Sequence, residues 1–281
     1  MSGRAELIKT TESNSVKEAA FWLGFSGVLM PVFGKSFLFA EQHNFFSRLG
    51  FQLYGYPFVG GWLRSVYFRK AISDLKPSRI LDAGCGAGEY SFYLAEKFPE
   101  LQAEACDLFA EAVKKNRETQ KKMNLSSIEF FQADIRKQLS RNQYDLIFSI
   151  DVLQGIREKE KVFKAFNLAL KKGGHLFLHI PFQNTKITVS KKGLPIDVGI
   201  KSTVSEGELL QAIKNAGFSI IESRKTFGFF GATAWKSDNF LMQKKAGIMR
   251  AAALPFLKFF AYFDTLAENR EGKSLMVLAR K

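Results

Sequence analysis

From residue 79 to the end of the chain, short apolar runs alternate with longer segments typical of helices. The apolar runs predict strands at residues 79–83, 103–106, 128–132, 144–150, 175–180, 218–223 and 274–279. Helices are expected between them, at 88–98, 110–122, 158–170 and 205–216. Runs such as Leu146-Ile147-Phe148 are apolar at consecutive positions, as a strand covered on both faces requires. The alternation therefore predicts an α/β fold, a seven-stranded and mostly parallel sheet with helices on both faces.

Residues at the ends of these segments support the boundaries. Pro99 follows the first helix of the alternation, and Ser205 and Glu208 have the spacing of a capping box at the start of the last one. The sequence Lys171-Lys172-Gly173-Gly174 predicts a helix end, because glycines leave the helix readily and cations suit its negative end.

The segments outside the alternation are richer in aromatic residues. Residues 1–75 are predicted to form an N-terminal helical cap, with two short helices in 16–50 and another at 60–75, before a domain at 76–281. Residues 19–34 are uncharged but would span only about 24 Å as a helix, less than the ~30 Å hydrocarbon core, so no membrane span is expected. Insertions at 183–204 and 224–273 are predicted to form a lid. The basic and apolar residues 246–263 suit either that lid or a helix lying on a membrane surface.

A glycine-rich turn follows the first predicted strand, in the sequence Asp82-Ala83-Gly84-Cys85-Gly86-Ala87-Gly88. Gly84 allows a sharp turn, Gly86 allows backbone N–H groups to approach a ligand, and Gly88 allows the next helix to pack closely. The spacing differs from the dinucleotide fingerprint G-x-G-x-x-G, which holds a pyrophosphate. The preceding acid would repel a pyrophosphate, but it suits a ligand that carries an ammonium or sulfonium group.

Each of the first four predicted strands ends at or just before an acid: Asp82, Asp107, Asp134 and Asp151. Open α/β sheets bind ligands at the carboxyl ends of their strands, so these side chains are expected to share a crevice. Each acid could instead be an ordinary helix N-cap, but four in succession favour a binding site.

The glycine turn and its acids resemble the first motifs of the class I S-adenosylmethionine-dependent methyltransferases, of the type that acts on small molecules or lipids. The resemblance covers residues 78–223 and the last strand. It implies a Rossmann-like sheet, S-adenosyl-L-methionine as cofactor and methyl transfer as reaction. In such enzymes the first acid and the glycine turn hold the methionine end, the second acid the ribose and the third the adenine amino group. The cofactor-binding residues implied are Asp82, Gly84, Cys85, Gly86, Gly88, Asp107, Leu108, Asp134, Ile135 and Asp151.

Methyl transfer from a sulfonium demands mainly alignment, and a general base only if the acceptor must lose a proton of high pKa. His179, near the end of the fifth strand, is the candidate catalytic base, although it could be a histidine satisfied within the sheet. Many relatives carry an acid and a histidine where Gln154 and Gly155 stand, so one potential base is absent. Tyr54 and Tyr56 are candidates for lining the substrate pocket, or they simply pack. No metal is expected.

The chain has 281 residues and a net charge of +14, which favours an anionic partner such as a phospholipid surface, a nucleic acid or an acidic substrate. Two cysteines, Cys85 and Cys106, indicate reduced thiols and a cytoplasmic location, with peripheral membrane contact in view. The sequence thus predicts methyl transfer to a small or lipid-like apolar acceptor. The alternatives are a nucleic-acid methyltransferase, disfavoured because Lys and Arg are scattered, and a non-catalytic S-adenosylmethionine-binding module.

Overall fold

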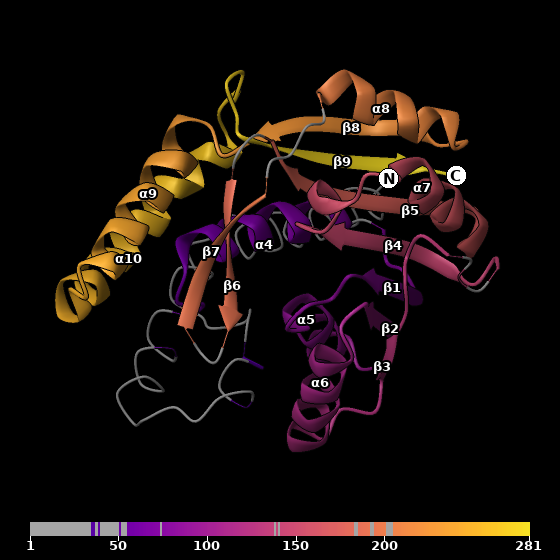
Figure 1. Ribbon diagram of the computed structural model, residues 1–281, viewed down its shortest axis with the longest axis horizontal. Helices are drawn as coiled ribbons and strands as arrows, with labels where there is room; N and C mark the ends of the chain where they lie inside the picture. The colour runs from indigo at the N-terminus through magenta and orange to yellow at the C-terminus, as the bar shows by residue number, and fades with distance from the viewer. Residues whose placement is uncertain are drawn as a thin grey trace, which may run out of the picture.

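The computed structural model describes residues 35–36, 39, 51, 55–73, 75–137, 139, 141–182, 185–191, 194–200 and 205–281. A seven-stranded sheet forms its centre (Figure 1). The strands are β1 (Arg79–Ala83), β2 (Gln102–Asp107), β3 (Ile128–Gln132), β4 (Tyr144–Ile150), β5 (Leu170–Pro181), β8 (Ser219–Thr226) and β9 (Ser274–Arg280). The predicted α/β fold with a mostly parallel sheet is confirmed.

The order of the strands creates a crevice. It is β3-β2-β1-β4-β5-β9-β8, in which β1 pairs in parallel with both β2 and β4. Consecutive connections therefore leave β1 in opposite directions, which makes the carboxyl ends of β1 and β4 the switch point where such sheets bind ligands. At the other side of the sheet, β9 is antiparallel to both β5 and β8.

Helices cover both faces of the sheet (Figure 1). On one face lie α4 (Val59–Ile72), α5 (Glu89–Lys97) and α6 (Ala110–Met123). Phe68 of α4 fixes this layer, because its ring lies 5.1 Å from that of Tyr90 in α5 and 4.8 Å from that of Phe148 in β4. The other face holds α7 (Lys159–Ala169) and α8 (Glu206–Asn215), whose buried Phe163 and Ile213 share a cluster with strand residues such as Leu176. The predicted capping box of Ser205 and Glu208 is present at the start of α8.

The long insertion before β9 forms two helices that lie side by side at one end of the molecule, α9 (Phe229–Gln243) and α10 (Gly247–Tyr262) (Figure 1). One buried carboxylate, that of Asp264, ties them to the rest of the fold. It accepts hydrogen bonds from the backbone N–H groups of Phe227 (2.8 Å) and Gly231 (2.9 Å) and from the hydroxyl of Tyr67 in α4 (2.8 Å). The start of α9, the end of α10 and α4 are therefore joined at a single point.

Short elements complete the described part. Two 3-10 turns, η1 (Leu153–Gly155) and η2 (Phe263–Thr265), follow β4 and α10. β6 (Thr185–Lys191) and β7 (Leu194–Ile200) pair as an antiparallel hairpin within the first predicted insertion. Among the helices that the structure describes, none is long and apolar enough to cross a membrane.

One predicted boundary is wrong. α7 ends at Ala169, and β5 begins at Leu170, so residues 171–174 are strand rather than a helix end. Lys171 makes an ion pair with Asp145 of β4 (2.7 Å), which stabilises the extended conformation. A register shift between Tyr144 and Leu146, together with the positive φ of Gly173 (79°), accommodates the extra length of the strand. The two short helices predicted in 16–50 lie outside the described residues.

Candidate functional site at the carboxyl ends of the strands

The four predicted acids all lie at the same edge of the sheet. Asp82 is the next-to-last residue of β1 and Asp107 the last of β2. Asp134 follows β3 by two residues, and Asp151 directly follows β4. These four strands are parallel neighbours, so their carboxyl ends meet at the crevice.

The three glycines of the turn have positive φ but different surroundings. At Gly84 (φ 91°) an added Cβ would lie 2.5 Å from the side chain of Val152, and at Gly88 (φ 73°) it would lie 2.8 Å from Phe92. At Gly86 (φ 52°) an added Cβ would meet nothing within 4 Å. The outer glycines are therefore required by packing. The middle one borders open space, where a ligand can lie next to its backbone.

Asp107 holds the turn in place. One of its carboxylate oxygens accepts a hydrogen bond from the N–H of Gly86 (2.9 Å), and the other accepts one from the N–H of Phe109 (3.0 Å). Each oxygen has further lone pairs, so the carboxylate can still accept bonds from a diol. The neighbouring Leu108 is 52% exposed. Asn116 of α6 donates to the carbonyl of Gly86 (2.8 Å) and supports the same turn.

Asp82 is buried beneath the turn and accepts a hydrogen bond from the hydroxyl of Ser91 (2.7 Å). Burial raises the pKa of this carboxyl to about 7, and the nearby charge of Asp107 adds to the shift while Ser91 opposes it. Cys85, in the turn itself, is a buried free thiol. Asp82 can therefore change its protonation state near neutral pH, and a cation in the crevice would favour the charged form.

Asp134 lies closer to the surface and is paired with Arg136. The guanidinium donates to both carboxylate oxygens, at 2.9 and 2.7 Å. These hydrogen bonds lower the pKa of Asp134 to about 2. Ile135, beside it, is buried. Asp134 is thus a carboxylate at all physiological pH values, with Arg136 occupying part of its accepting capacity.

Asp151 is the centre of a chain of polar contacts that joins four elements. Its carboxylate is 3.2 Å from Nε of Arg64 in α4 and 2.7 Å from Nδ1 of His179 in β5. His179 Nε2 in turn lies 3.1 Å from the hydroxyl oxygen of Thr226, at the end of β8. Burial raises the pKa of Asp151, but the charges of Arg64 and His179 outweigh it and the net shift is downward. Because the carboxylate can only accept, Nδ1 of His179 donates to it, and Nε2 lies within hydrogen-bonding distance of the Thr226 hydroxyl.

This arrangement has a consequence for the predicted role of His179. The ring is buried, and both of its nitrogens are hydrogen-bonded. To act as a base, His179 would first have to release its hydrogen bond with Thr226 and bind the substrate that receives the methyl group. Its catalytic role stays a prediction.

The predicted substrate residue Tyr56 is buried and packs tightly on α4, since a Cβ on Gly61 would lie 2.1 Å from its ring. Its hydroxyl donates to Glu89 Oε1 (2.6 Å) in the first turn of α5. Burial raises the pKa of Glu89, against the opposing effects of Tyr56 and Arg64. Tyr54 lies outside the described residues.

Three side chains of the site were missed in the sequence: Arg64, Glu89 and Thr226. Glu89 directly follows the glycine turn, which could have indicated it. Arg64 and Thr226 carry no local signal, because only the tertiary fold brings them to Asp151 and His179. Gly155, where many relatives have a histidine, is exposed, and the neighbouring Gln154 is buried and donates to the carbonyl of Asp151 (2.5 Å).

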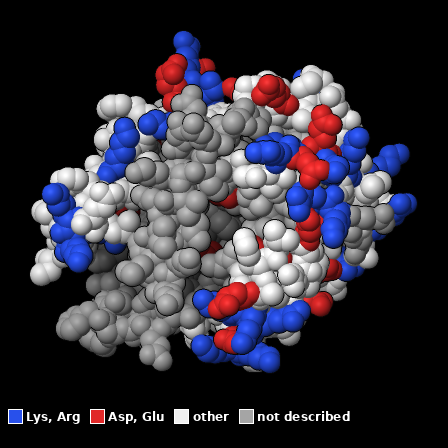
Figure 2. Space-filling model, in the orientation of Figure 1, with Lys and Arg blue, Asp and Glu red and all other residues white. Residues whose placement is uncertain are grey.

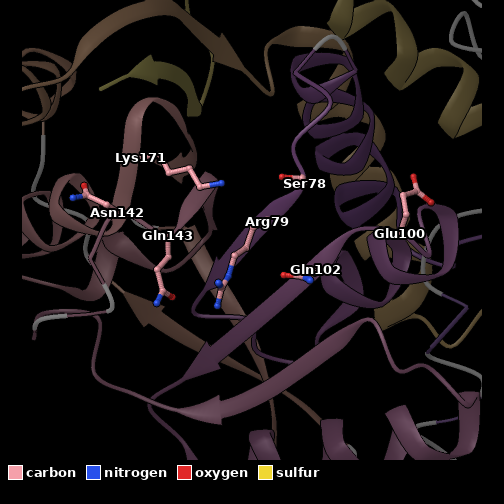
Figure 3. A pocket seen from close by; sticks show the side chains of 7 residues that line it. All are labelled: Ser78, Arg79, Glu100, Gln102, Asn142, Gln143 and Lys171. Atoms are coloured by element: carbon pink, nitrogen blue, oxygen red, sulfur yellow. The ribbon is translucent and has the colours of Figure 1, made fainter.

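A shallow recess lies at the opposite edge of the sheet, among the amino-terminal ends of the strands (Figure 3). Both of its cations are paired with acids outside the recess, Arg79 with Glu104 (2.5 Å) and Lys171 with Asp145 (2.7 Å). We therefore assign no function to it. Among the described residues, no group of three or more His, Cys, Asp and Glu side chains could hold a metal ion.

Comparisons with known proteins agree with this geometry. The family described as "Methyltransferase domain" matches residues 75–216. Phosphoethanolamine N-methyltransferase 3 of Arabidopsis thaliana is 29% identical over 161 residues, which cover 50% of this chain and 32% of that protein. Malonyl-[acyl-carrier protein] O-methyltransferase 2 of Ilyobacter polytropus is 33% identical over 34% of this chain and 36% of its own length. The chain thus matches only about a third of the length of these relatives.

Solved structures show the same fold. Phosphoethanolamine N-methyltransferase 2 of Haemonchus contortus, in complex with S-adenosyl-L-methionine, has a TM-score of 0.59 at 20% identity, over 83% of this chain and 55% of that one. A putative sarcosine dimethylglycine methyltransferase from Galdieria sulphuraria has a TM-score of 0.54 at 19% identity, over 79% and 84% of the two chains. The fold is therefore that of the class I S-adenosylmethionine-dependent methyltransferases. Since the family match covers half of its residues, the chain itself belongs to the methyltransferase-domain family.

Proposed function

We propose that this protein transfers a methyl group from S-adenosyl-L-methionine to a small or lipid-like acceptor. The observation that carries the proposal is the open space beside Gly86, which lies between two crowded glycines and whose N–H donates to the carboxylate of Asp107, with the carboxylate of Asp82 buried at the end of β1. That combination suits a ligand with a ribose diol and a cationic end, and the family match supports it. When bound, S-adenosyl-L-methionine supplies an already activated methyl group.

The chain's own residues would bind and orient the cofactor and exclude water. Asp107 would accept hydrogen bonds from the ribose hydroxyls, and Asp134 would accept one from the adenine amino group. The carboxylate of Asp82 would stabilise the positive charge at the methionine end of the cofactor. Arg64 fixes the carboxylate of Asp151, which in turn fixes the tautomer of His179. If the acceptor must lose a proton, His179 is the group that would take it at Nε2, after release of the Thr226 hydroxyl.

The acceptor class is supported by the relatives and by the aromatic insertion. Curated relatives have small or carrier-bound substrates in their names, including phosphoethanolamine and malonyl-[acyl-carrier protein]. Phe227, at the start of the aromatic insertion, packs against His179 with ring centroids 5.9 Å apart. Both side chains are buried, so an apolar acceptor would reach this aromatic neighbour of the predicted base only inside the protein.

Calorimetric titration with S-adenosylhomocysteine tests the cofactor assignment. Wild type should bind, and Asp107→Ala should bind roughly 10- to 150-fold more weakly, because hydrogen bonds to a charged group contribute about 1.5–3 kcal/mol. The control is Glu118→Ala, which removes an exposed acid from α6 and should leave the affinity unchanged. Absence of binding by wild type, or equal binding by Asp107→Ala, would refute the proposal.

A labelled methyl donor tests the acceptor. Label is expected in the lipid or small-molecule fraction of a cell extract incubated with the protein. Label in RNA would instead favour the nucleic-acid alternative that the charge of +14 leaves open. Binding of S-adenosylhomocysteine without transfer to any fraction would favour a non-catalytic binding module.

We further propose that the protein works in the cytoplasm and rests on a membrane surface. Both cysteines are free and buried, which suits a reducing compartment. The basic charge favours an anionic surface. Fractionation of cells that produce the protein, with and without high salt in the buffer, tests both statements.

A further inference from the structure

The helices α9 and α10 expose an unusual amount of apolar surface. Of the twelve large apolar side chains that are exposed in the described part of the chain, eight lie between residues 229 and 266. Met249, Phe256, Phe259 and Phe263 follow one another at intervals of seven, three and four residues, which places them on one side of α10. We call the following residues the hairpin face: Phe240, Ile248, Met249, Phe256, Phe259 and Phe263. Two of them are almost fully solvated, Ile248 at 91% and Phe256 at 76% exposure.

This face is not a core surface left over by chance, because α10 has a separate buried side. Leu254, Lys258 and Ala261 are its buried residues. Lys258 Nζ lies 5.9 Å from the ring centroid of Trp62 in α4, so that side of the helix packs against the body of the protein. The packing of α10 within the part of the chain that the structure describes therefore leaves the hairpin face exposed.

The charges around the hairpin face have one sign. Between residues 227 and 263 the only acid is Asp238, which is buried and bonded to Arg250 (2.7 Å) and to the N–H of Val59 (3.0 Å). The exposed charged residues are Lys236, Lys244 and Lys245. Figure 2 shows Lys and Arg side chains at the free end of the hairpin amid uncharged surface. The face thus combines aromatic side chains with cations and presents no exposed carboxylate.

We infer that the hairpin face binds a membrane surface that contains anionic phospholipid. Phenylalanine and isoleucine would enter the boundary between headgroups and acyl chains, and the lysines would contact lipid phosphates. A second copy of the chain fits less well, because a two-fold contact joins the same face of both copies, and this face has no exposed carboxylate to pair with its lysines. The inference rests on the proposed membrane contact and names the surface that makes it, but it does not depend on the proposed methyl transfer or on the crevice.

Vesicle flotation of the full chain tests the inference. Wild type should float with vesicles of phosphatidylcholine and phosphatidylglycerol but not with phosphatidylcholine alone, and high salt should weaken the binding. The double variant Lys244→Glu/Lys245→Glu should bind at least about 25-fold more weakly, since each lysine near such a surface contributes roughly fivefold. The double variant Ile248→Ser/Phe256→Ser should bind the vesicles at least about tenfold more weakly, because it loses apolar contact with the lipid.

Matched variants separate the hairpin face from general effects. Lys114→Glu/Lys115→Glu makes the same change in net charge on exposed residues of α6 and should retain most of the binding. Leu168→Ser/Ile221→Ser removes two exposed apolar side chains elsewhere and should float like wild type. Every variant should bind S-adenosylhomocysteine with the affinity of wild type, which shows that the fold and the crevice are intact.

Three results would overturn the inference: equal flotation with neutral vesicles, equal losses in the matched variants, or a dimer in light scattering that Ile248→Ser/Phe256→Ser dissociates. The failure of the proposed function would look different. In that case wild type would bind no S-adenosylhomocysteine, whatever its behaviour with vesicles.

Discussion

At the scale of single residues, the turn after β1 separates packing from ligand binding. Gly84 and Gly88 each face side chains that leave no room for a Cβ, whereas Gly86 faces none. Glycine at the first and third positions is explained by the fold alone. Glycine at the second position is favoured by its positive φ (52°), and the open space beside it leaves room for a ligand close to its backbone.

Substitution by alanine tests this difference. Gly86→Ala should cost about 1–2 kcal/mol of folding free energy, because of its positive φ, and should abolish measurable binding of S-adenosylhomocysteine. Gly84→Ala should lower the melting temperature more, because its Cβ would also lie 2.5 Å from Val152. Thermal denaturation and calorimetry measure the two effects. Undiminished binding by Gly86→Ala would show that the open space is not the ligand site.

Asp82 should make ligand binding depend on pH. Its pKa is raised to about 7, mainly by burial, and the ammonium group of S-adenosylhomocysteine, which has no sulfonium charge, would favour the carboxylate. The affinity for S-adenosylhomocysteine should therefore increase as pH rises through about 7, by no more than tenfold per pH unit. Calorimetry across this range measures the slope, and Asp82→Asn should flatten it. A slope that persists in Asp82→Asn would assign the proton to another group.

The same residue affects the stability of the free protein in the opposite direction. The folded-state pKa of Asp82 lies above the ordinary value of 3.8, so the native state binds the extra proton between about 4 and about 7. The contribution of Asp82 to the free energy of unfolding therefore falls as pH rises through that window. A bound cationic ligand offsets this loss.

The acids of the site could be predicted from sequence because each stands at the end of an apolar run. Arg64, which contacts Asp151, could not be, because nothing near it in the chain distinguishes it from other helix arginines. Its partner is a strand-end carboxylate far along the sequence, and only the packing of α4 on the sheet brings the two together.

At the scale of elements, β1, β3 and β4 begin and end where the apolar runs predict. The sequence misled at residues 171–174, where glycines and lysines resemble a helix end but continue a strand. The contacts that accompany the strand there are long-range ones that local patterns do not contain: the backbone hydrogen bonds of Gly173 and Gly174 with Lys281, and the ion pair of Lys171 with Asp145. In the insertion before β9, the basic and apolar residues 246–263 were kept open between a lid and a surface helix. The structure shows a helix there, α10, but does not decide between those roles.

The packing of α10 on α4 includes one buried cation. Burial lowers the pKa of Lys258 to about 7, Asp238 opposes this shift, and Arg250 adds to it. The unfolded chain keeps the ordinary pKa of 10.5, so it binds more protons between about 7 and about 10.5. The unfavourable contribution of Lys258 to stability therefore diminishes as pH rises through that window.

Replacing this cation by an apolar side chain should stabilise the protein. Lys258→Met should raise the melting temperature at pH 7, because it removes a buried charge while Asp238 keeps its bonds to Arg250 and Val59. The gain should be smaller at high pH, where Lys258 is already neutral. Thermal denaturation at two pH values measures the effect. Lys236→Met, on the exposed side of α9, should change stability by less than about 0.5 kcal/mol. A lower melting temperature for Lys258→Met would mean that the lysine contributes a net stabilising contact.

At the scale of the whole molecule, the alternation of strands and helices was sufficient to predict the α/β class, because each parallel pair needs a crossover. It was also sufficient to place the site, since all crossovers return the chain to the same edge of the sheet. It could not predict the antiparallel position of β9 or the way in which α9 and α10 lean on α4. Those features depend on contacts between distant segments, such as the bonds of Asp264 to Tyr67 and Phe227.

Ligand binding should stabilise the molecule as a whole. S-adenosylhomocysteine at about a hundredfold its dissociation constant should add about 2.7 kcal/mol to the free energy of unfolding. For a chain of this size the melting temperature should rise by roughly 5–10 °C. A dinucleotide such as NAD should leave the melting temperature unchanged, because the carboxylate of Asp82 would repel its pyrophosphate. A larger shift with NAD than with S-adenosylhomocysteine would contradict the assigned ligand.

The carboxylate of Asp264 bonds to Tyr67 of α4 and to the N–H groups of Phe227 and Gly231, at the start of α9. Because it joins these segments, α9 and α10 have little freedom to swing against the sheet. A leaflet touching them would meet the sheet at one inclination, and the mouth of the crevice would stand at a constant height above the lipid. Which acceptors the enzyme can reach would then depend on depth in the leaflet as well as on chemistry.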